Sequence, residues 1–270
     1  MVVFPPAKIN LGLSIIAKRN DDYHDVETVM IPIPFVDILE IIPSESFEFH
    51  SSGIAIPSDS KDNLCVKAFE LIRQKHNIPN VYMHLRKQIP MGAGLGGGSS
   101  DAAYVLKTLN ELFELHLSLE TLEEYAAQLG SDCPFFIQTI PQLAKGRGEV
   151  LTSIPLTLHS YYLVLLNPGI HVGTKDAYAG VIPQVKENSI LDSVQQEVNT
   201  WQEYLVNDFE KSVFFQFPEI AKLKENLLQN GAIYAAMSGS GSSVFGIYKN
   251  KPEIPSSLSD FVVFQGFFEA

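Results

Sequence analysis

The run 90–103, Pro-Met-Gly-Ala-Gly-Leu-Gly-Gly-Gly-Ser-Ser-Asp-Ala-Ala, is the feature that most limits how this chain can fold. Five of the 18 glycines lie within positions 92–98. A strand-like stretch, 81–85, comes before the run, and the residues after it have the spacing of one buried helical stripe: Ala102, Val105, Leu106, Leu109, Leu112 and Phe113. Glycine lets backbone N–H groups approach an anion, and a helix N-terminus adds unpaired N–H groups. The run therefore predicts a phosphate site. The alternative is a flexible linker or a tight turn, but linkers rarely run straight into a helix.

Two familiar phosphate loops do not fit this run. A Walker loop ends in Gly-Lys-Ser/Thr, whereas residues 98–100 are Gly-Ser-Ser. Residues 92–97 have the letters of the dinucleotide motif Gly-x-Gly-x-x-Gly, but a second helical pattern, 119–129, follows where a Rossmann unit needs a strand. Ser99 and Ser100 point to a triphosphate, because their hydroxyls can bind phosphate oxygens or reach Mg²⁺. Helix capping is the alternative role for each serine.

Composition sets outer limits on function. The chain has 270 residues, 46% of them hydrophobic, which suits one large compact domain or two small ones. A net charge of −12 argues against a nucleic-acid partner, so a phosphate ligand must meet cations gathered locally. The candidate cations are Lys8, Lys87, Lys145 and Arg147. Cys65 and Cys133 make no disulfide framework and predict buried free thiols. With no evident signal peptide or membrane span, a cytoplasmic protein without a membrane partner is expected.

The apolar spacing predicts an α+β chain rather than a regular βαβ repeat. Helices are expected at 63–76, directly after the glycine run, at 119–129, at about 192–206 and at 219–229. Strands are expected at 8–16, 36–42, 47–50, 81–85, 161–166, 232–237 and 244–248. A domain boundary is expected near 150–160, after the glycine-rich turn 146–148.

Several motifs together resemble the GHMP kinases, the superfamily of galactokinase, homoserine kinase and mevalonate kinase. The glycine run indicates only the superfamily. Seven further blocks, spread over nearly the whole chain, resemble the branch that acts on a cytidine diphosphate-linked methylerythritol: 6–11, 21–24, 62–64, 130–136, 144–149, 167–169 and 237–241. The resemblance implies a two-domain fold, with a ribosomal-protein-S5-like, nucleotide-binding N-terminal domain over 1–155 and a ferredoxin-like C-terminal domain over 156–270. It also implies ATP and Mg²⁺, and we expect a monomer or weak homodimer.

Lys8 and Asp132 are the catalytic residues that the resemblance implies. From the residues alone, Lys8 in an apolar strand favours an exposed face, and Asp132 favours a cap or a turn. In the family the matching residues flank the acceptor hydroxyl, which is the 2-hydroxyl of the methylerythritol in the non-mevalonate isoprenoid pathway. Asp132 would accept the hydroxyl proton, and Lys8 would keep Asp132 ionised and draw the hydroxyl toward its alkoxide.

Two alternative functions stay open at this stage. One is another kinase of the superfamily, of the homoserine or mevalonate type, whose substrate has no base to stack. The other is a non-catalytic nucleotide-binding relative, which should have lost Lys8 or Asp132.

The resemblance also implies the ATP-binding residues and a metal ligand. Ser100 is the implied ligand of Mg²⁺. Asn63 is implied to contact adenine, and capping of the helix that starts there is compatible with that role. Lys87 could reach the nucleotide, with an exposed strand end as the alternative. The whole ATP-binding set is Asn63, Lys87, Pro90, Met91, Gly92, Ala93, Gly94, Leu95, Gly96, Gly97, Gly98, Ser99 and Ser100.

A second implied set binds the cytidylyl substrate. Tyr23 and Tyr178 would stack on the two faces of the cytosine, and His24 would bond to its edge; otherwise, exposed aromatic residues in a loop are incidental. Asp22 stands where the family usually has glycine, and Asp tolerates φ > 0 better than most residues. The segment 238–241 is implied to lie beside the phosphates, with a simple hairpin turn as the alternative. The whole set is Asn10, Tyr23, His24, Asp132, Thr174, Tyr178, Gly239 and Gly241.

Overall fold

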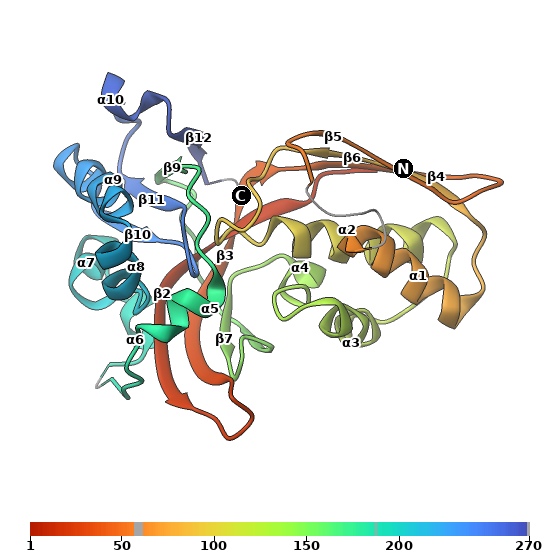
Figure 1. Ribbon diagram of the computed structural model, residues 1–270, viewed down its shortest axis with the longest axis horizontal. Coiled ribbons are helices and arrows are strands. Elements are labelled where there is room, and N and C mark those ends of the chain that lie inside the picture. The colour runs from red at the N-terminus through yellow and green to blue at the C-terminus, as the bar shows by residue number, and fades with distance from the viewer. Residues whose placement is uncertain (57–61, 187, 269–270) are drawn as a thin grey trace. The chain divides into compact units, whose positions relative to one another are not determined.

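The computed structural model describes residues 1–56, 62–186 and 188–268 (Figure 1). The chain forms two compact units, each assembled from segments that are discontinuous in sequence. The first unit consists of Met1–Ala7, Phe35–Met91 and Gly96–Ile140, and the second of Lys8–Pro34, Gly92–Leu95 and Pro141–Ala270. The predicted boundary after residue 155 falls inside the second unit and stays a prediction about domains.

The first unit packs helices against one sheet. The sheet has the order β1 (Val2–Val3), β4 (Ile38–Pro43), β6 (Val81–Lys87), β5 (Glu48–Gly53). β4 runs antiparallel to β6, and β5 runs parallel to it. The helices lie on one side of this sheet (Figure 1): α1 (Leu64–His76), α2 (Gly97–Leu112), α3 (Leu119–Leu129) and α4 (Phe135–Gln138). Between the layers the side chains are fully buried, among them Leu39, Ile41, Phe69, Ile72, Met83 and Leu106.

The second unit contains two sheets. Most of β2 (Pro6–Lys18) and β3 (His24–Val36) belongs to it. These two strands form one sheet with β7 (Gln142–Lys145) and β8 (Val150–Ser153), in the order β2-β3-β7-β8. The other sheet is antiparallel throughout, with the order β10 (Tyr234–Met237), β11 (Val244–Tyr248), β9 (Tyr162–Leu166), β12 (Val262–Phe267). α9 (Pro218–Gln229) packs on β10 and β11, and its first residue is a proline, the residue favoured at that position.

Short helices complete the second unit: α5 (Thr174–Ala179), α6 (Ile190–Val194), the 3₁₀ turn η2 (Val198–Thr200), α7 (Trp201–Tyr204), α8 (Glu210–Gln216) and α10 (Ser256–Ser259). Within the described parts of the chain, no helix is long and apolar enough to cross a membrane.

The expected elements agree with the structure at most of the strongly patterned segments. The helices expected at 63–76, 119–129 and 219–229 are α1, α3 and α9. The helix expected at 192–206 is wrong as one element, because the chain breaks into α6, η2 and α7 there. β3 was not expected, since two prolines and two acidic residues interrupt the apolar pattern of 24–36. The strand expected at 36–42 begins only at Ile38, because Asp37 leaves the ladder and accepts backbone N–H bonds.

Candidate active site

The glycine run forms a loop that leads directly into α2, as expected. Gly96 is the N-cap residue, with φ 68°, and it has no side chain with which to bond the first turn. Ser99 and Ser100 lie inside that turn, so the alternative in which they cap the helix is wrong. The N–H groups at the start of α2 therefore have no side-chain cap from the N-cap position, which suits anion binding.

Gly94 needs to be glycine for two independent reasons. Its φ of 77° is left-handed, and a Cβ there would lie 1.9 Å from the carbonyl oxygen of Ser238. Gly92–Leu95 fold with the second unit, and the run from Gly96 onward folds with the first. In the second unit, the backbone of the glycine run thus packs directly on the backbone of 238–241.

Lys8 lies beside this contact. Its side chain is buried, which contradicts the exposed face that the residues alone favour. The Lys8 ammonium donates to Asn10 Oδ1 at 2.6 Å and to the Gly94 carbonyl oxygen at 3.0 Å. Asn10 is held in turn by Thr28, because its Nδ2 donates to Thr28 Oγ1 at 3.1 Å. The cation is therefore fixed against the glycine loop by bonds on two sides.

The segment 238–241 completes this cluster. The Ser238 hydroxyl donates to the Gly94 carbonyl oxygen at 2.8 Å, and the Ser243 N–H donates to the carbonyl of Ala93 at 3.2 Å. Thr174 Oγ1 lies 3.4 Å from Ser240 Oγ. Two predicted substrate residues, Asn10 and Thr174, thus contact the same cluster as the predicted Gly239.

The predicted base-binding residues are only partly together. The rings of His24 and Tyr178 stack with centroids 4.8 Å apart and an interplanar angle of 21°. Tyr178 also makes an edge contact with Phe209 at 4.7 Å. Tyr23 is 57% exposed, and the Arg147 guanidinium covers its ring at 5.0 Å. His24 therefore occupies a face of Tyr178 that a stacked cytosine would use.

Asp22, beside this pair, has φ 64°, the left-handed conformation that a glycine would take. The side chain that replaces the family's usual glycine thus leaves the turn geometry intact, at some conformational cost.

Asp132 lies in the turn between α3 and α4 of the first unit. It follows Gly130, the C-cap of α3, and is half-buried. The next residue, Cys133, is buried, and burial raises the pKa of its thiol to about 11 even though a hydrogen bond from Ser99 opposes the rise. The turn that carries Asp132 therefore contacts the first turn of α2. The expected free, buried thiols are confirmed for Cys65 and Cys133.

A small pocket of about 160 Å³ in the first unit gathers four of the predicted ATP-binding residues: Asn63, Lys87, Met91 and Gly98. Asn63 is also the N-cap of α1, and its Oδ1 accepts the Cys65 N–H at 2.8 Å. The side-chain oxygen of Asn63 is therefore occupied, whereas its amide nitrogen, Nδ2, makes no hydrogen bond to the residues that the structure describes.

Separate substitutions at Asn63 should distinguish the two roles. Asn63→Ala is expected to lower the free energy of unfolding by about 1 kcal/mol, because the cap is lost. Asn63→Asp keeps an oxygen for Cys65 and should leave stability almost unchanged. Both variants are expected to raise KM for ATP by roughly two- to tenfold, the value of one neutral hydrogen bond. Urea unfolding and steady-state kinetics measure the two effects, and a normal KM in Asn63→Asp would contradict the adenine contact.

Lys87 is buried, so the alternative of an exposed strand end is wrong. Its ammonium donates to Asp101 Oδ2 at 2.7 Å and also to Asp37, whose other oxygen accepts the Gln88 and Ile89 N–H groups. Burial alone would lower the pKa of Lys87, but the two carboxylates outweigh it and the pKa is raised. Burial raises the pKa of Asp101, against the opposing effect of Lys87.

This network lies at the start of α2. A Cβ on Gly97 would come within 2.9 Å of the Lys87 ammonium and 2.8 Å of Ile89. Since Lys87 already has two carboxylate partners, its contact with the nucleotide remains a proposal. The bonds that the structure shows link Lys87 to Asp37 and to Asp101, which lies in α2.

The two other candidate cations also pair with carboxylates. Lys145 lies 3.3 Å from Glu27, and Arg147 lies 3.3 Å from Glu149. Both cations are about half exposed, so these pairs add little to stability.

Comparison with known proteins shows the family of this chain. The model of the GHMP kinases N terminal domain matches residues 63–139, and that of the GHMP kinases C terminal domain matches residues 190–258. The 4-diphosphocytidyl-2-C-methyl-D-erythritol kinase of Cytophaga hutchinsonii is 50% identical over 94% of this chain and 94% of its own length. The enzyme of that name from Azobacteroides pseudotrichonymphae is 48% identical over 97% of this chain and 98% of its own length.

The chain belongs to the 4-diphosphocytidyl-2-C-methyl-D-erythritol kinase family of the GHMP kinases. A crystal structure of a 4-(cytidine 5'-diphospho)-2C-methyl-D-erythritol kinase agrees, with a TM-score of 0.80, 33% identity and coverage of 92% of this chain and 90% of that one. A homoserine kinase from Cytophaga hutchinsonii has a TM-score of 0.72 at 16% identity over 93% and 85% of the two chains, and this likeness shows the fold alone. The expected α+β fold of the GHMP kinases is thereby confirmed.

Two groups of residues that support the site were not identified from the sequence. Asp37 and Asp101 complete the Lys87 network; a lone acid after the apolar stretch 29–36 is the signal that could have indicated Asp37. Asn207 and Glu210 hold the segment that leads into 238–241, and no local pattern marks them.

Proposed function

We propose that this protein transfers the γ-phosphoryl group of ATP to the 2-hydroxyl of 4-diphosphocytidyl-2-C-methyl-D-erythritol, in the non-mevalonate isoprenoid pathway. The observation that carries the proposal is the cluster around Gly94, in a chain that belongs to this kinase family. The Lys8 ammonium and the Ser238 hydroxyl both donate to the Gly94 carbonyl oxygen. A buried cation therefore sits against the loop whose backbone suits phosphate binding.

Asp132 and Lys8 have distinct tasks in this proposal. Phosphoryl transfer passes through a loose transition state, so positioning and charge stabilisation dominate catalysis. Asp132 accepts the proton of the 2-hydroxyl and orients its oxygen toward the γ-phosphorus. Lys8, already desolvated and fixed by Asn10, supplies positive charge where negative charge gathers on the transferring group.

Ser100 is the residue that would hold Mg²⁺. Its Oγ is buried and has no hydrogen-bond partner among the described residues, so this oxygen is available to bind a ligand. No cluster of three or more His, Cys, Asp or Glu that could hold a metal lies in those residues. Mg²⁺ does not need one, since it often binds through one or two protein oxygens, substrate phosphates and water. When bound, it would neutralise charge on the β- and γ-phosphates.

Tyr178 provides a test of base recognition. Stacking of a base on an aromatic ring contributes about 1–3 kcal/mol, so Tyr178→Ala should raise KM for the cytidylyl substrate by roughly ten- to a hundredfold. Tyr178→Phe should be mild, because stacking needs the ring. KM for ATP should stay within about a factor of three in both variants, because the proposed adenine pocket does not include Tyr178. Equal loss for both substrates would contradict the proposal.

His24→Ala extends this test. The imidazole now stacks on Tyr178, so the proposal requires it to leave that face and turn to the edge of the base. His24→Ala should therefore reduce the discrimination between cytidylyl and uridylyl forms of the substrate. Unchanged discrimination would remove His24 from base recognition.

A coupled ATPase assay tests the function as a whole. We expect turnover with the cytidylyl substrate and none with homoserine or mevalonate at equal concentrations. Turnover with homoserine or mevalonate would favour another kinase of the superfamily, and no turnover with any acceptor would favour a non-catalytic relative. We further propose that the enzyme works in the cytoplasm as a monomer or weak homodimer.

A further inference from the structure

We propose that Asn207 is a positioning residue: its side-chain amide fixes the segment 238–241 and, through it, the Gly94 part of the phosphate loop. The inference rests on the proposed kinase function for its effect on turnover. The structural part of it stands on contacts within the second unit and can be measured independently.

Asn207 is almost completely buried and uses both ends of its amide. Nδ2 donates to the carbonyl oxygens of Met237 and Gly239, both at 2.8 Å. Oδ1 accepts the N–H of Phe209 at 3.0 Å. Gly239 is one of the predicted substrate-binding residues, so this amide holds the backbone of a proposed binding segment.

The contacts of Asn207 are needed because β10 lies at an edge of its sheet. The outward backbone groups of an edge strand must find partners elsewhere when they are buried. Glu210 accepts the Met237 N–H at 2.8 Å, while Asn207 bonds the Met237 carbonyl. The last residue of β10 is thus held at both of its backbone groups, and the direction in which 238–241 leaves the strand is fixed.

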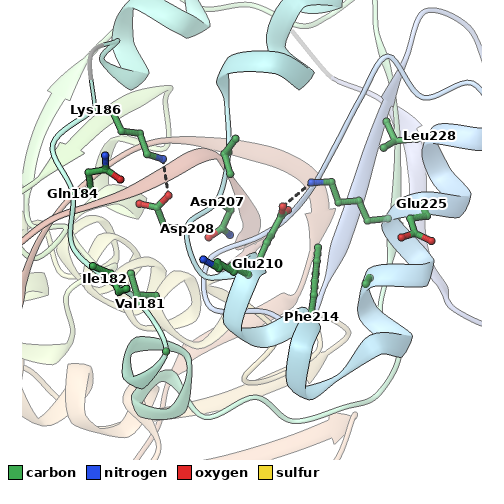
Figure 2. A pocket seen from close by; sticks show the side chains of 15 residues that line it. Val181, Ile182, Gln184, Lys186, Asn207, Asp208, Glu210, Phe214, Glu225 and Leu228 are labelled. Carbon is green, nitrogen blue, oxygen red and sulfur yellow. Dashed lines mark hydrogen bonds and ion pairs between the residues drawn. The ribbon is translucent and has the colours of Figure 1, made fainter.

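The turn 207–210, which contains Asn207 and Glu210, also holds β2, the strand that carries Lys8. The Asp208 carboxylate accepts the Ile15 N–H at 2.8 Å, and the Asp208 N–H donates to the Leu13 carbonyl at 2.8 Å. Figure 2 shows this turn lining a pocket of about 680 Å³, where Asp208 pairs with Lys186. Residues 207–210 therefore join β2, with its Lys8 and Asn10, to the segment that contacts Gly94.

Asparagine is the side chain that meets all of these demands. Two N–H donors must reach two carbonyls while an oxygen faces Phe209. Aspartate has nearly the same shape and keeps the acceptor for Phe209, but it cannot donate and turns an oxygen toward the two carbonyls. Asn207→Asp therefore removes the proposed function of the residue while keeping its size.

The experiment compares Asn207→Asp with Val213→Ala in the full chain. Val213 lies in α8, is 1% exposed and packs in the core of the second unit, without a bond to 238–241. Its truncation lowers Tm through a cavity. Asn207→Asp is expected to lower kcat by about ten- to a hundredfold, the usual effect of a misplaced reacting group. KM for ATP should rise less, by about three- to tenfold, because the phosphate loop loses part of its support but meets no new overlap. Val213→Ala should keep both constants below its Tm.

Hydrogen–deuterium exchange supplies the second measurement. Amides in 237–243 should exchange faster in Asn207→Asp and at the original rate in Val213→Ala. If Asn207→Asp does not fold, Asn207→Ser takes its place, since serine adds no charge and donates to only one carbonyl.

Amide exchange rates and a kcat equal to those of the wild-type protein in the Asn207 variant would overturn the inference. An equal loss of kcat in Val213→Ala would overturn it as well. A different outcome would separate the two proposals. If exchange is faster in the Asn207 variant but the wild-type protein phosphorylates none of the acceptors, the positioning role is supported and the proposed function is rejected.

Discussion

Asp132→Asn and Lys8→Met are each expected to lower kcat by about two to four decades. Removal of a positioned proton acceptor or of a charge stabiliser at the transition state has effects of this size. Asparagine keeps the size of Asp132 in its turn but cannot take the hydroxyl proton. Methionine fills the buried space of Lys8 but leaves the Gly94 carbonyl and Asn10 without their cation.

Single-turnover and steady-state kinetics measure these losses, and titration with a nonhydrolysable ATP analogue gives the affinity. Affinity for the analogue should change little, because the glycine loop is intact in both variants. Lys251→Met and Asp260→Asn, both on the surface and outside the proposed site, are controls that should behave as wild type. Near-normal turnover in Asp132→Asn or Lys8→Met would remove that residue from the mechanism.

Gly94→Ala should abolish measurable ATP binding. The added Cβ would lie 1.9 Å from the Ser238 carbonyl oxygen, and alanine also disfavours the φ of 77°. Since backbone faces backbone here, no side-chain rotation relieves the overlap, and the loop must move away from 238–241. The phosphate-binding N–H groups move with it.

Gly231→Ala is the matched control for backbone strain alone. Gly231 lies outside the proposed site, has a φ of 91°, and an added Cβ there would meet no heavy atom within 4 Å. That variant has the conformational cost of Gly94→Ala without the backbone overlap, so it should bind the ATP analogue as wild type does. Analogue titration and far-UV circular dichroism on both variants decide the matter. A folded Gly94→Ala protein with wild-type affinity would mean that the phosphates bind elsewhere.

The sequence was a good guide where a physical constraint is local. The glycine run predicted a tight loop and the helix after it, because few other structures need five glycines in seven positions, and three of those glycines are left-handed in the structure. The cap at Asn63 was likewise predictable from a single residue, whereas the left-handed Asp22 was indicated by the family resemblance, which places a glycine there. Only the family resemblance indicated that Lys8 belongs to a site, since an apolar strand does not tell which of its faces is buried, and the contact of Lys8 with Gly94 was not predicted.

The remaining features depend on contacts far apart in sequence. Lys87 meets Asp37 across 50 residues, and Asn207 meets Gly239 across 32. No periodicity links such pairs, so the sequence does not show that Lys87 is neutralised within the core. The misjudged helix at 192–206 has a related cause, because its apolar residues fit a helical stripe but pack as three short pieces.

The Lys87 network couples the folding of the first unit to proton uptake. Burial raises the pKa of Asp101 above its ordinary value, against the attraction of Lys87 and with the help of Asp37. Between the ordinary and the raised value, the folded unit holds a proton that the unfolded chain has released. The contribution of this group to the free energy of unfolding is therefore complete on the acid side of that interval and is lost as the pH rises through the raised value. The free energy of unfolding should therefore fall as the pH rises through the raised pKa of Asp101, which urea unfolding over a series of pH values measures.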